Sequence, residues 1–245
     1  MNLKTDSELK IMQEGGRISA MALARVLELV RAGVSTLELN KMAEDTILQN
    51  GGTPSFKIVD GYDFATCINV NAGLVHGLPG RYKLELGDVV SVDLGTYYKG
   101  FHTDLSYTVE VETDKQREFL ETGKRALENG IAACVLGNRV GDISHSIQRG
   151  VEKAGFSVSR DLIGHGIGRN LHESPQVPGY GRKNRGVPLQ VGMTLAVEVI
   201  YQKGSPEIDL LDDGWTIVTA DGSLAALFES TVAITANEPL VLTSL

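Results

Sequence analysis

The sequence predicts an α+β fold made of two similar halves. Along the 245 residues, helical and strand-like patterns follow one another in the order helix, helix, strands, helix, helix, strands. A second observation is internal similarity. The segments 84–93 and 189–198 both read Leu, two residues, Gly, five mostly apolar residues and an acid. Matching segments at a fixed offset are typical of a duplicated unit, so we expect a pseudo-twofold axis relating the halves.

The first half opens with two predicted helices. Thr5 followed by Glu8 forms a capping box, a pattern that begins helices, and apolar residues recur at helical spacing over residues 9–29. Gly33 interrupts this pattern. Residues 36–50 then carry an apolar stripe of their own, which predicts a second amphipathic helix.

Strand patterns and a second pair of helices come next. Residues 55–111 contain short β-branched runs separated by Gly, Pro and Asn, which predict strands and hairpins. Residues 115–136 and 142–154 return to helical spacing, and each segment is followed by a glycine that can end a helix. From about residue 157 to the end the pattern again predicts strands.

The composition is that of an ordinary globular chain. The 31 acidic residues outnumber the 23 basic ones, which gives a formal net charge of −8 and a pI of about 5.2. This balance argues against a nucleic acid or an anionic membrane as the main partner. Cys67 and Cys134 are far apart, so a disulfide framework is not indicated. The N-terminus does not resemble a signal peptide and no apolar run approaches the ~18 residues that span a bilayer, so we expect a cytoplasmic protein.

Acidic residues inside apolar runs are the first functional signal. Asp93 and Glu198 each end the run that the two similar segments share. A carboxylate in such a place costs free energy unless it is paired or bound to a metal. One example would most simply be an acid at the exposed end of a strand. Because the anomaly occurs twice at equivalent places, we expect the pseudo-twofold axis to bring both acids into one site.

A hairpin is predicted to add a third acid. Asp93 and Asp104 lie in two strand-like runs joined near Tyr98, Lys99 and Gly100. A turn centred between Tyr98 and Lys99 would place the two acids directly opposite each other, where their charges repel. They would then need a cation between them, or one would stay protonated. The alternative is a bulge at Gly100 that shifts the register and separates them.

The complete set of embedded acids suits a hard metal ion. Glu229 lies in another apolar run, and His165, flanked by glycines, is the best nitrogen donor. Four carboxylates and one imidazole favour manganese, iron, cobalt or zinc over copper(I) or an iron–sulfur cluster. Four negative charges exceed what one divalent ion neutralises, so we expect two ions. Two neighbouring ions are typical of hydrolases, because they lower the pKa of a water and stabilise the developing oxyanion.

These residues together resemble the type I methionine aminopeptidases, a family with the pita-bread fold. The similarity covers essentially the whole chain, and its motifs occur in the family's order. They are Cys67-Ile-Asn-Val-Asn71 before His76-Gly-Leu-Pro, Asp93 with Gly100-Phe-His-Thr-Asp104, Gly164-His-Gly-Ile-Gly168, His172-Glu-Ser-Pro-Gln-Val, Asp212-Asp-Gly-Trp-Thr, and Glu229 before Thr231. The resemblance implies one metallopeptidase domain over residues 1–245, in which a central antiparallel sheet joins the two halves and is backed by helices.

The resemblance also implies roles for single residues. Its five metal ligands fall on the residues found above from embedded acids, which are Asp93, Asp104, His165, Glu198 and Glu229. The residue matching Glu198 is also held to shuttle the proton of the attacking water. The residue matching His172 supports the scissile carbonyl, and the one matching His76 contacts the amide. These roles fit the rule that a general base must touch the water and a hydrogen-bond donor must face the oxyanion.

The expected methionine pocket differs from the family pattern. The family's pocket walls fall on Tyr62, Cys67 and Trp215, and Trp215 alone could equally be a core residue. Val59 stands where we align an aromatic residue of the family, and Leu171 stands before His172 where an aromatic is usual. The pocket is therefore expected to be wider and less aromatic.

Two other functions remain open on the sequence. The sequence around Asp93 and Asp104 also resembles that of the Xaa-Pro-directed aminopeptidases and prolidases. That branch typically has Arg at the position of Tyr107 and carries an additional N-terminal domain. The short spacing between His165 and Glu198 argues against the type II branch, which carries an insertion there. A non-catalytic peptide-binding module is disfavoured, because such proteins have typically lost metal ligands.

The expected function is therefore removal of the N-terminal methionine from new polypeptides by a dinuclear metallopeptidase. The partner is the N-terminus of a peptide or nascent chain. We expect a monomer, and docking on the ribosome remains open.

Overall fold

The computed structural model describes residues 2–244 and contains a large antiparallel sheet, a small second sheet and four α-helices. The large sheet has ten strands, in the order β1-β4-β5-β12-β9-β7-β8, with three short strands at its sides. Its strands are β1 (Thr53–Pro54), β2 (Thr66–Val70), β4 (Val89–Tyr98), β5 (Phe101–Glu110), β6 (Ser157–Val158), β7 (Ile163–Gly166), β8 (Glu173–Pro178), β9 (Thr194–Gln202), β12 (Ala225–Ala233) and β13 (Leu240–Val241). The small sheet contains β3 (Gly73–Val75), β10 (Ile208–Leu210) and β11 (Ile217–Thr219).

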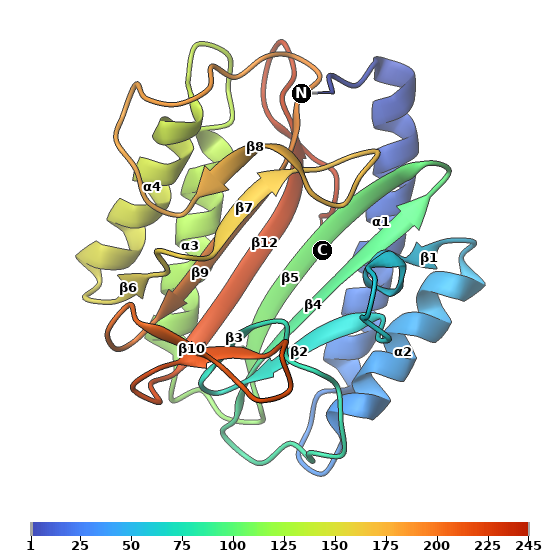
Figure 1. Ribbon diagram of the computed structural model, residues 1–245, viewed down its shortest axis with the longest axis vertical. Coiled ribbons are helices and arrows are strands. Elements are labelled where there is room, and N and C mark those ends of the chain that lie inside the picture. The colour runs from blue at the N-terminus through green and yellow to red at the C-terminus, as the bar shows by residue number, and fades with distance from the viewer. Residues whose placement is uncertain (1, 245) are drawn as a thin grey trace.

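The helices form two pairs on one face of the large sheet (Figure 1). In the first pair, α1 packs against β4 and β5 and α2 packs against β1 and β2. In the second pair, α3 packs against β9 and β12 and α4 packs against β6 and β8. The predicted capping box at Thr5 and Glu8 is confirmed, since both of its hydrogen bonds are present. The helices are α1 (Asp6–Leu29), α2 (Thr36–Gln49), α3 (Arg117–Ala132) and α4 (Val140–Lys153), with a short 3₁₀ turn at Phe56–Ile58.

The two expected halves meet at the centre of the large sheet. Strands β4 and β5 with α1 and α2 form one half, β12 and β9 with α3 and α4 form the other, and β5 pairs with β12 between them (Figure 1). Asp93 and Glu198 are both the fifth residue of their strands, β4 and β9. The internal similarity therefore reflects equivalent places in the two halves, as the sequence predicted.

The register of the β4–β5 hairpin differs from the expectation. Asp93 pairs with Ser106 and Asp104 pairs with Gly95, so the two acids are diagonal neighbours and the predicted direct opposition is wrong. The turn is Lys99–Gly100, and its φ angles of 47° and 94° are both positive, as a two-residue type I′ turn requires. The ladder runs without a bulge, so both acids still face the same side of the sheet.

Alternation along the strands separates the core from the functional face. Val92 and Leu94 are buried beneath α1 and α2, so Asp93 between them points to the opposite face. In the second half, Val197 and Val199 are buried against α3 and α4 on either side of Glu198. The helices thus fill one face of the sheet with hydrophobic core and leave the other face for acidic residues. No helix within residues 2–244 is long and apolar enough to cross a membrane.

Close packing of α3 on the sheet depends on a glycine. A Cβ atom added to Gly123 would lie 2.5 Å from the Phe228 ring and 2.6 Å from the Tyr201 ring. We expect Gly123→Ala to lower the free energy of unfolding by about 1–3 kcal/mol, because overpacking a full core strains it. Urea unfolding measures this. Asn129→Ala, at an exposed position of the same helix, is the matched control. Equal stability of both variants would contradict the packing argument.

Candidate metal centre and substrate pocket

Three acids form a row across the centre of the large sheet. Asp93 on β4 pairs with Ser106 on β5, Ser106 pairs with Glu229 on β12, and Glu229 pairs with Glu198 on β9. Residues paired in this way project from the same face, and neighbouring strands are about 4.8 Å apart. The row therefore places two carboxylates of the second half side by side, with the carboxylate of the first half one strand further along, beyond Ser106.

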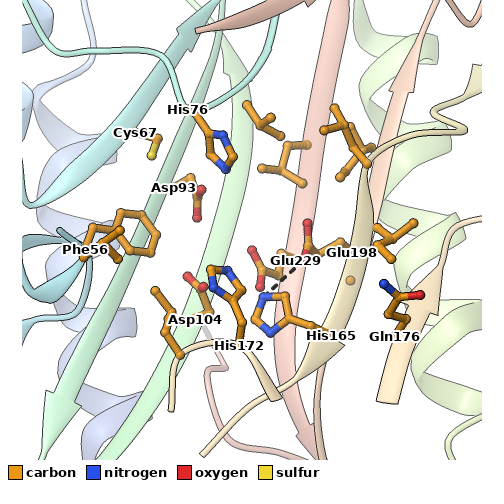
Figure 2. A pocket seen from close by; sticks show the side chains of 18 of the residues that line it. Phe56, Cys67, His76, Asp93, Asp104, His165, His172, Gln176, Glu198 and Glu229 are labelled. Atoms are coloured by element: carbon orange, nitrogen blue, oxygen red, sulfur yellow. Dashed lines mark ion pairs between the residues drawn. The ribbon is translucent and has the colours of Figure 1, made fainter. Parts of the chain in front are cut away.

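The two remaining predicted ligands flank this row. Asp104 lies on β5 two residues before Ser106, so it shares the same face. His165 on β7 pairs with Ala196, two residues before Glu198, and its Nε2 atom is 3.5 Å from Glu198 Oε1. Figure 2 shows the four carboxylates and this imidazole converging on one space. The structure thus brings together all five residues that the sequence singled out.

The four carboxylates are buried and lack basic partners. Their exposed fractions are between 3% and 9%, and within residues 2–244 no Lys or Arg forms an ion pair with any of them. Burial raises the pKa of Asp93 to about 8. Burial and the neighbouring carboxylates raise the pKa of each of the other three well above its usual value. The protein alone therefore does not stabilise four negative charges here.

The donor atoms fit a divalent metal. Asp93 Oδ1 and Glu229 Oε1 are buried and have no hydrogen-bond partner within the described part of the chain, although buried polar atoms normally have one. Ligand atoms of Asp104, His165 and Glu229 all lie within 4.8 Å of one another. Carboxylate oxygens with one imidazole nitrogen are a suitable donor set for Mn, Fe, Co or Zn. The residues present thus fit a metal centre.

His165 is held in the form that binds metals. Its Nδ1 atom is 2.9 Å from the carbonyl oxygen of Gly166, to which the ring N–H donates, so Nε2 is left as the free acceptor. Burial, with a smaller contribution from nearby His172, lowers the pKa of His165 to about 4. The imidazole is therefore neutral near pH 7.

Asp104 is anchored through its backbone. The hydroxyl of Thr231 on β12 accepts a hydrogen bond from the backbone N–H of Asp104 and donates one to its carbonyl oxygen, both at 2.8 Å. This contact links the two halves beside the site. No separate sequence signal pointed to it, because a Thr in a strand is common.

The acids line one cavity of about 610 Å³ together with the predicted pocket residues. The cavity reaches every residue proposed for substrate binding: Val59, Tyr62, Cys67, His76, Leu171, His172 and Trp215. It is also lined by residues that the sequence reasoning missed, among them Phe56, Leu162, Gln176, Ile200 and Leu227. No sequence signal pointed to Gln176 beyond its place in the motif that begins at His172. Nothing in the sequence around Phe56 distinguished it from an aromatic residue of the core.

One end of the cavity is apolar and tightly packed. The rings of Tyr62 and Trp215 meet edge to face with centroids 5.0 Å apart, and the centroid of the Phe56 ring lies 6.4 Å from that of Tyr62. The Tyr62 hydroxyl donates to the carbonyl oxygen of Thr66 at 2.9 Å and lies 3.1 Å from Cys67 Sγ. Its polar atom is thus satisfied, and the ring faces form an uncharged wall. Trp215 lies at this wall, which favours the pocket interpretation over a purely core role.

Two accessible histidines lie on opposite sides of the acids. His76 is near Cys67 and Asp93, whereas His172 lies beside His165 with ring centroids 4.4 Å apart (Figure 2). Both imidazoles are exposed to the cavity. His76 has a positive φ of 58°, a backbone conformation that is uncommon outside glycine and is often found at functional sites. The cavity thus combines an apolar end, an acidic floor and two neutral or cationic hydrogen-bonding groups.

Comparisons with known proteins agree over the whole chain. The model of metallopeptidase family M24 matches residues 10–236. A methionine aminopeptidase of Clostridium perfringens is 44% identical, with 98% of each chain covered. Methionine aminopeptidase 1 of Bacillus subtilis is 43% identical, covering 95% of this chain and 94% of that protein.

Solved structures give the same result for the fold. The structure of a methionine aminopeptidase from Thermotoga maritima superposes with a TM-score of 0.97 at 41% identity, and both chains are covered completely. A prolidase from Pyrococcus furiosus shares the fold with a TM-score of 0.80 at 24% identity, covering 99% of this chain and 65% of that one. The pita-bread fold is thereby confirmed. The chain belongs to metallopeptidase family M24 and, within it, to the methionine aminopeptidases.

Proposed function

We propose that this chain hydrolyses the N-terminal methionine from peptides and nascent polypeptides with the help of two divalent metal ions. The observation that carries the proposal is the group of four buried carboxylates and one neutral imidazole without a basic partner, set in the same cavity as an apolar pocket. The metal ligands are Asp93, Asp104, His165, Glu198 and Glu229. Two ions are proposed because their four positive charges balance the four carboxylates.

When bound, the ions would lower the pKa of a water and stabilise negative charge on the scissile carbonyl oxygen. The donor set accepts manganese, iron, cobalt or zinc, so the metal used depends on supply. The protein contributes a rigid and dehydrated arrangement. The strand register fixes the spacing of the carboxylates, and the Gly166 carbonyl fixes the orientation of the His165 ring.

Glu198 is proposed as the proton shuttle. It lies at the end of the carboxylate row and beside His165, and it is one of the carboxylates whose pKa burial raises. A carboxylate at this place suits the role, because it can take a proton from the attacking water and then release it to the leaving amine. One residue can perform both transfers because water and amine meet at the same carbon atom.

His172 and His76 are proposed to hold the substrate from its two sides. His172 lies close to His165 and can donate a hydrogen bond to the carbonyl oxygen as negative charge develops there. His76 lies near Cys67 and the apolar end, where it can contact the scissile amide (Figure 2). In this arrangement the methionine side chain occupies the space between Tyr62, Cys67 and Trp215.

The apolar end suits a thioether side chain. Aromatic rings make favourable contacts with a methionine sulfur atom, and Phe56, Tyr62 and Trp215 supply such rings. Val59 and Leu171 line the same cavity and are smaller than the aromatic residues expected there. We propose that this pocket accepts methionine with less strict exclusion of other apolar residues.

The proposed setting is the cytoplasm, where new polypeptides emerge. We propose that the enzyme acts as a monomer, since both halves of its site come from one chain. Docking on the ribosome would bring the enzyme close to emerging polypeptides, but the site does not need it for catalysis.

Removing a metal ligand should abolish activity through loss of metal. For Asp104→Ala and Glu229→Ala we expect turnover below about one thousandth of wild type, because a site missing one anionic ligand loses both affinity and geometry. Metal content by mass spectrometry and folding by circular dichroism separate loss of metal from unfolding. Asp114→Ala removes an exposed acid and is the control. Substantial turnover in either ligand variant would contradict the two-metal assignment.

Removing His172 should affect chemistry and leave the metal in place. We expect His172→Ala to lower kcat by about 10²–10³-fold, the usual effect of losing one donor to a developing oxyanion, with unchanged metal content. Steady-state kinetics on a Met-Ala-Ser peptide measure it. His145→Ala on α4 is the control, and kcat equal to wild type in His172→Ala would refute the role.

A peptide panel tests the substrate assignment. Peptides that differ in the first residue, together with an Ala-Pro peptide, should be assayed with each of the four metals. We expect cleavage of Met-Ala-Ser, weaker cleavage when leucine replaces methionine, and none of Ala-Pro. Preferential cleavage of Ala-Pro would favour the Xaa-Pro-directed alternative. Binding of peptides without cleavage under every metal would favour a non-catalytic module.

A further inference from the structure

A buried ion pair ties the N-terminal segment to the loop that carries His172. Lys4 Nζ lies 2.8 Å from Glu173 Oε2, and the two side chains are 1% and 5% exposed. The residues are far apart in sequence, since Lys4 precedes α1 and Glu173 begins β8. Removing two charges from water costs several kcal/mol per ion unless geometry and further hydrogen bonds compensate. A buried ion pair is therefore weak evidence for a role in stability. Its position beside the loop that carries His172 suggests a different role.

The ion pair holds the loop between β7 and β8 at several points. The other oxygen of Glu173, Oε1, accepts a hydrogen bond from the backbone N–H of Asn170 at 3.1 Å. The Lys4 side chain passes so close to Gly168 that a Cβ atom there would lie 2.4 Å from Nζ. The backbone N–H of Lys4 donates to the carbonyl oxygen of Gly192 at 2.7 Å. The backbone of Lys4 is therefore fixed, and its side chain holds the loop in place through Glu173.

His172 has few contacts of its own that could hold it. Within residues 2–244 its imidazole makes no hydrogen bond to another residue, and its side chain is exposed to the cavity. Its ring meets only His165 edge to face among the aromatic contacts of the described chain. The position of the ring is therefore determined mainly by the backbone of the loop.

A second, weaker attachment supports the same loop. Arg169 forms an ion pair with Glu8 of α1, and its guanidinium lies 5.3 Å from the centroid of the Phe101 ring. Both side chains of that ion pair are partly exposed, so its contribution is screened by solvent. The buried pair is thus the main polar attachment of the loop to the N-terminal segment.

We propose that Lys4 and Glu173 are positioning residues that hold His172 against the scissile carbonyl of the substrate. The role of His172 at the carbonyl rests on the proposed function, whereas the anchoring of its loop does not. Placing a catalytic group about 1 Å away from its productive position can cost about 10²-fold in rate. Glu173 lines the cavity and Lys4 does not, so the Lys4 variant is the one that isolates an effect acting through the loop.

The test compares single and double variants. Lys4→Met removes the charge and keeps the aliphatic stem, and Glu173→Gln keeps an oxygen for the Asn170 N–H. In the double variant K4M/E173Q no buried charge is left unpaired, so it should fold even if a single variant does not. Lys41→Met is the matched control, because Lys41 forms an exposed ion pair with Asp45 in α2.

The expected kinetic result is a selective loss of turnover. In Lys4→Met and in the double variant, kcat on a Met-Ala-Ser peptide should fall at least tenfold, while KM stays within threefold and metal content equals that of wild type. Lys41→Met should match wild type in kcat, KM and metal content. A double variant that is folded, loaded with metal and as fast as wild type would overturn the proposal.

A second readout does not require turnover. In protein labelled with ¹³C-histidine, and with the His172 signal assigned from His172→Gln, we expect the double variant to shift or broaden the His172 resonance and leave that of His145 unchanged. An unchanged His172 resonance would overturn the anchoring. Wild-type protein that cleaves no methionyl peptide would refute the proposed function and leave this readout valid.

Discussion

The site depends on the strand register that sets three carboxylates in one row on the sheet. Glu198 and Glu229 are direct neighbours in this row. Like charges about 5 Å apart repel by about 3 kcal/mol at an effective dielectric constant of 20, and this repulsion adds to the cost of burial. Asp93, Glu198 and Glu229 cannot move apart, because each lies between two strand residues that are buried in the sheet. Protons or metal ions must therefore compensate the charge.

Neither half of the molecule contains the complete set of site residues. The first half contributes Asp93 and Asp104, and the second contributes Glu198, Glu229 and His165. Strands β5 and β12 join the halves at the level of Glu229, and the hydroxyl of Thr231 holds the backbone of Asp104 from across this boundary. Metal ions bound there would link the halves directly, so metal binding and stability should be coupled.

Local and repeated sequence patterns predicted much of the fold and of the site, whereas features that depend on a particular pairing escaped them. The capping box at Thr5, the equivalence of Asp93 and Glu198, and the set of embedded acids all depend on patterns within short segments. The hairpin register was misjudged because Lys99, the first turn residue, gives no signal for a positive φ. The Lys4–Glu173 pair escaped notice because it joins residues 169 positions apart, and charged residues near a helix start or strand start usually face solvent.

The four site carboxylates also affect the net charge that the folded chain carries near pH 7. The formal value of −8 counts all four site carboxylates as ionised. Without metal, their raised pKa values mean that part of the group carries protons near pH 7. With two divalent ions, four positive charges would offset the carboxylates and leave about −4. In both states the surface is less acidic than the composition implies. Protons and metal ions compete for the same oxygens, so metal affinity should weaken as the pH falls.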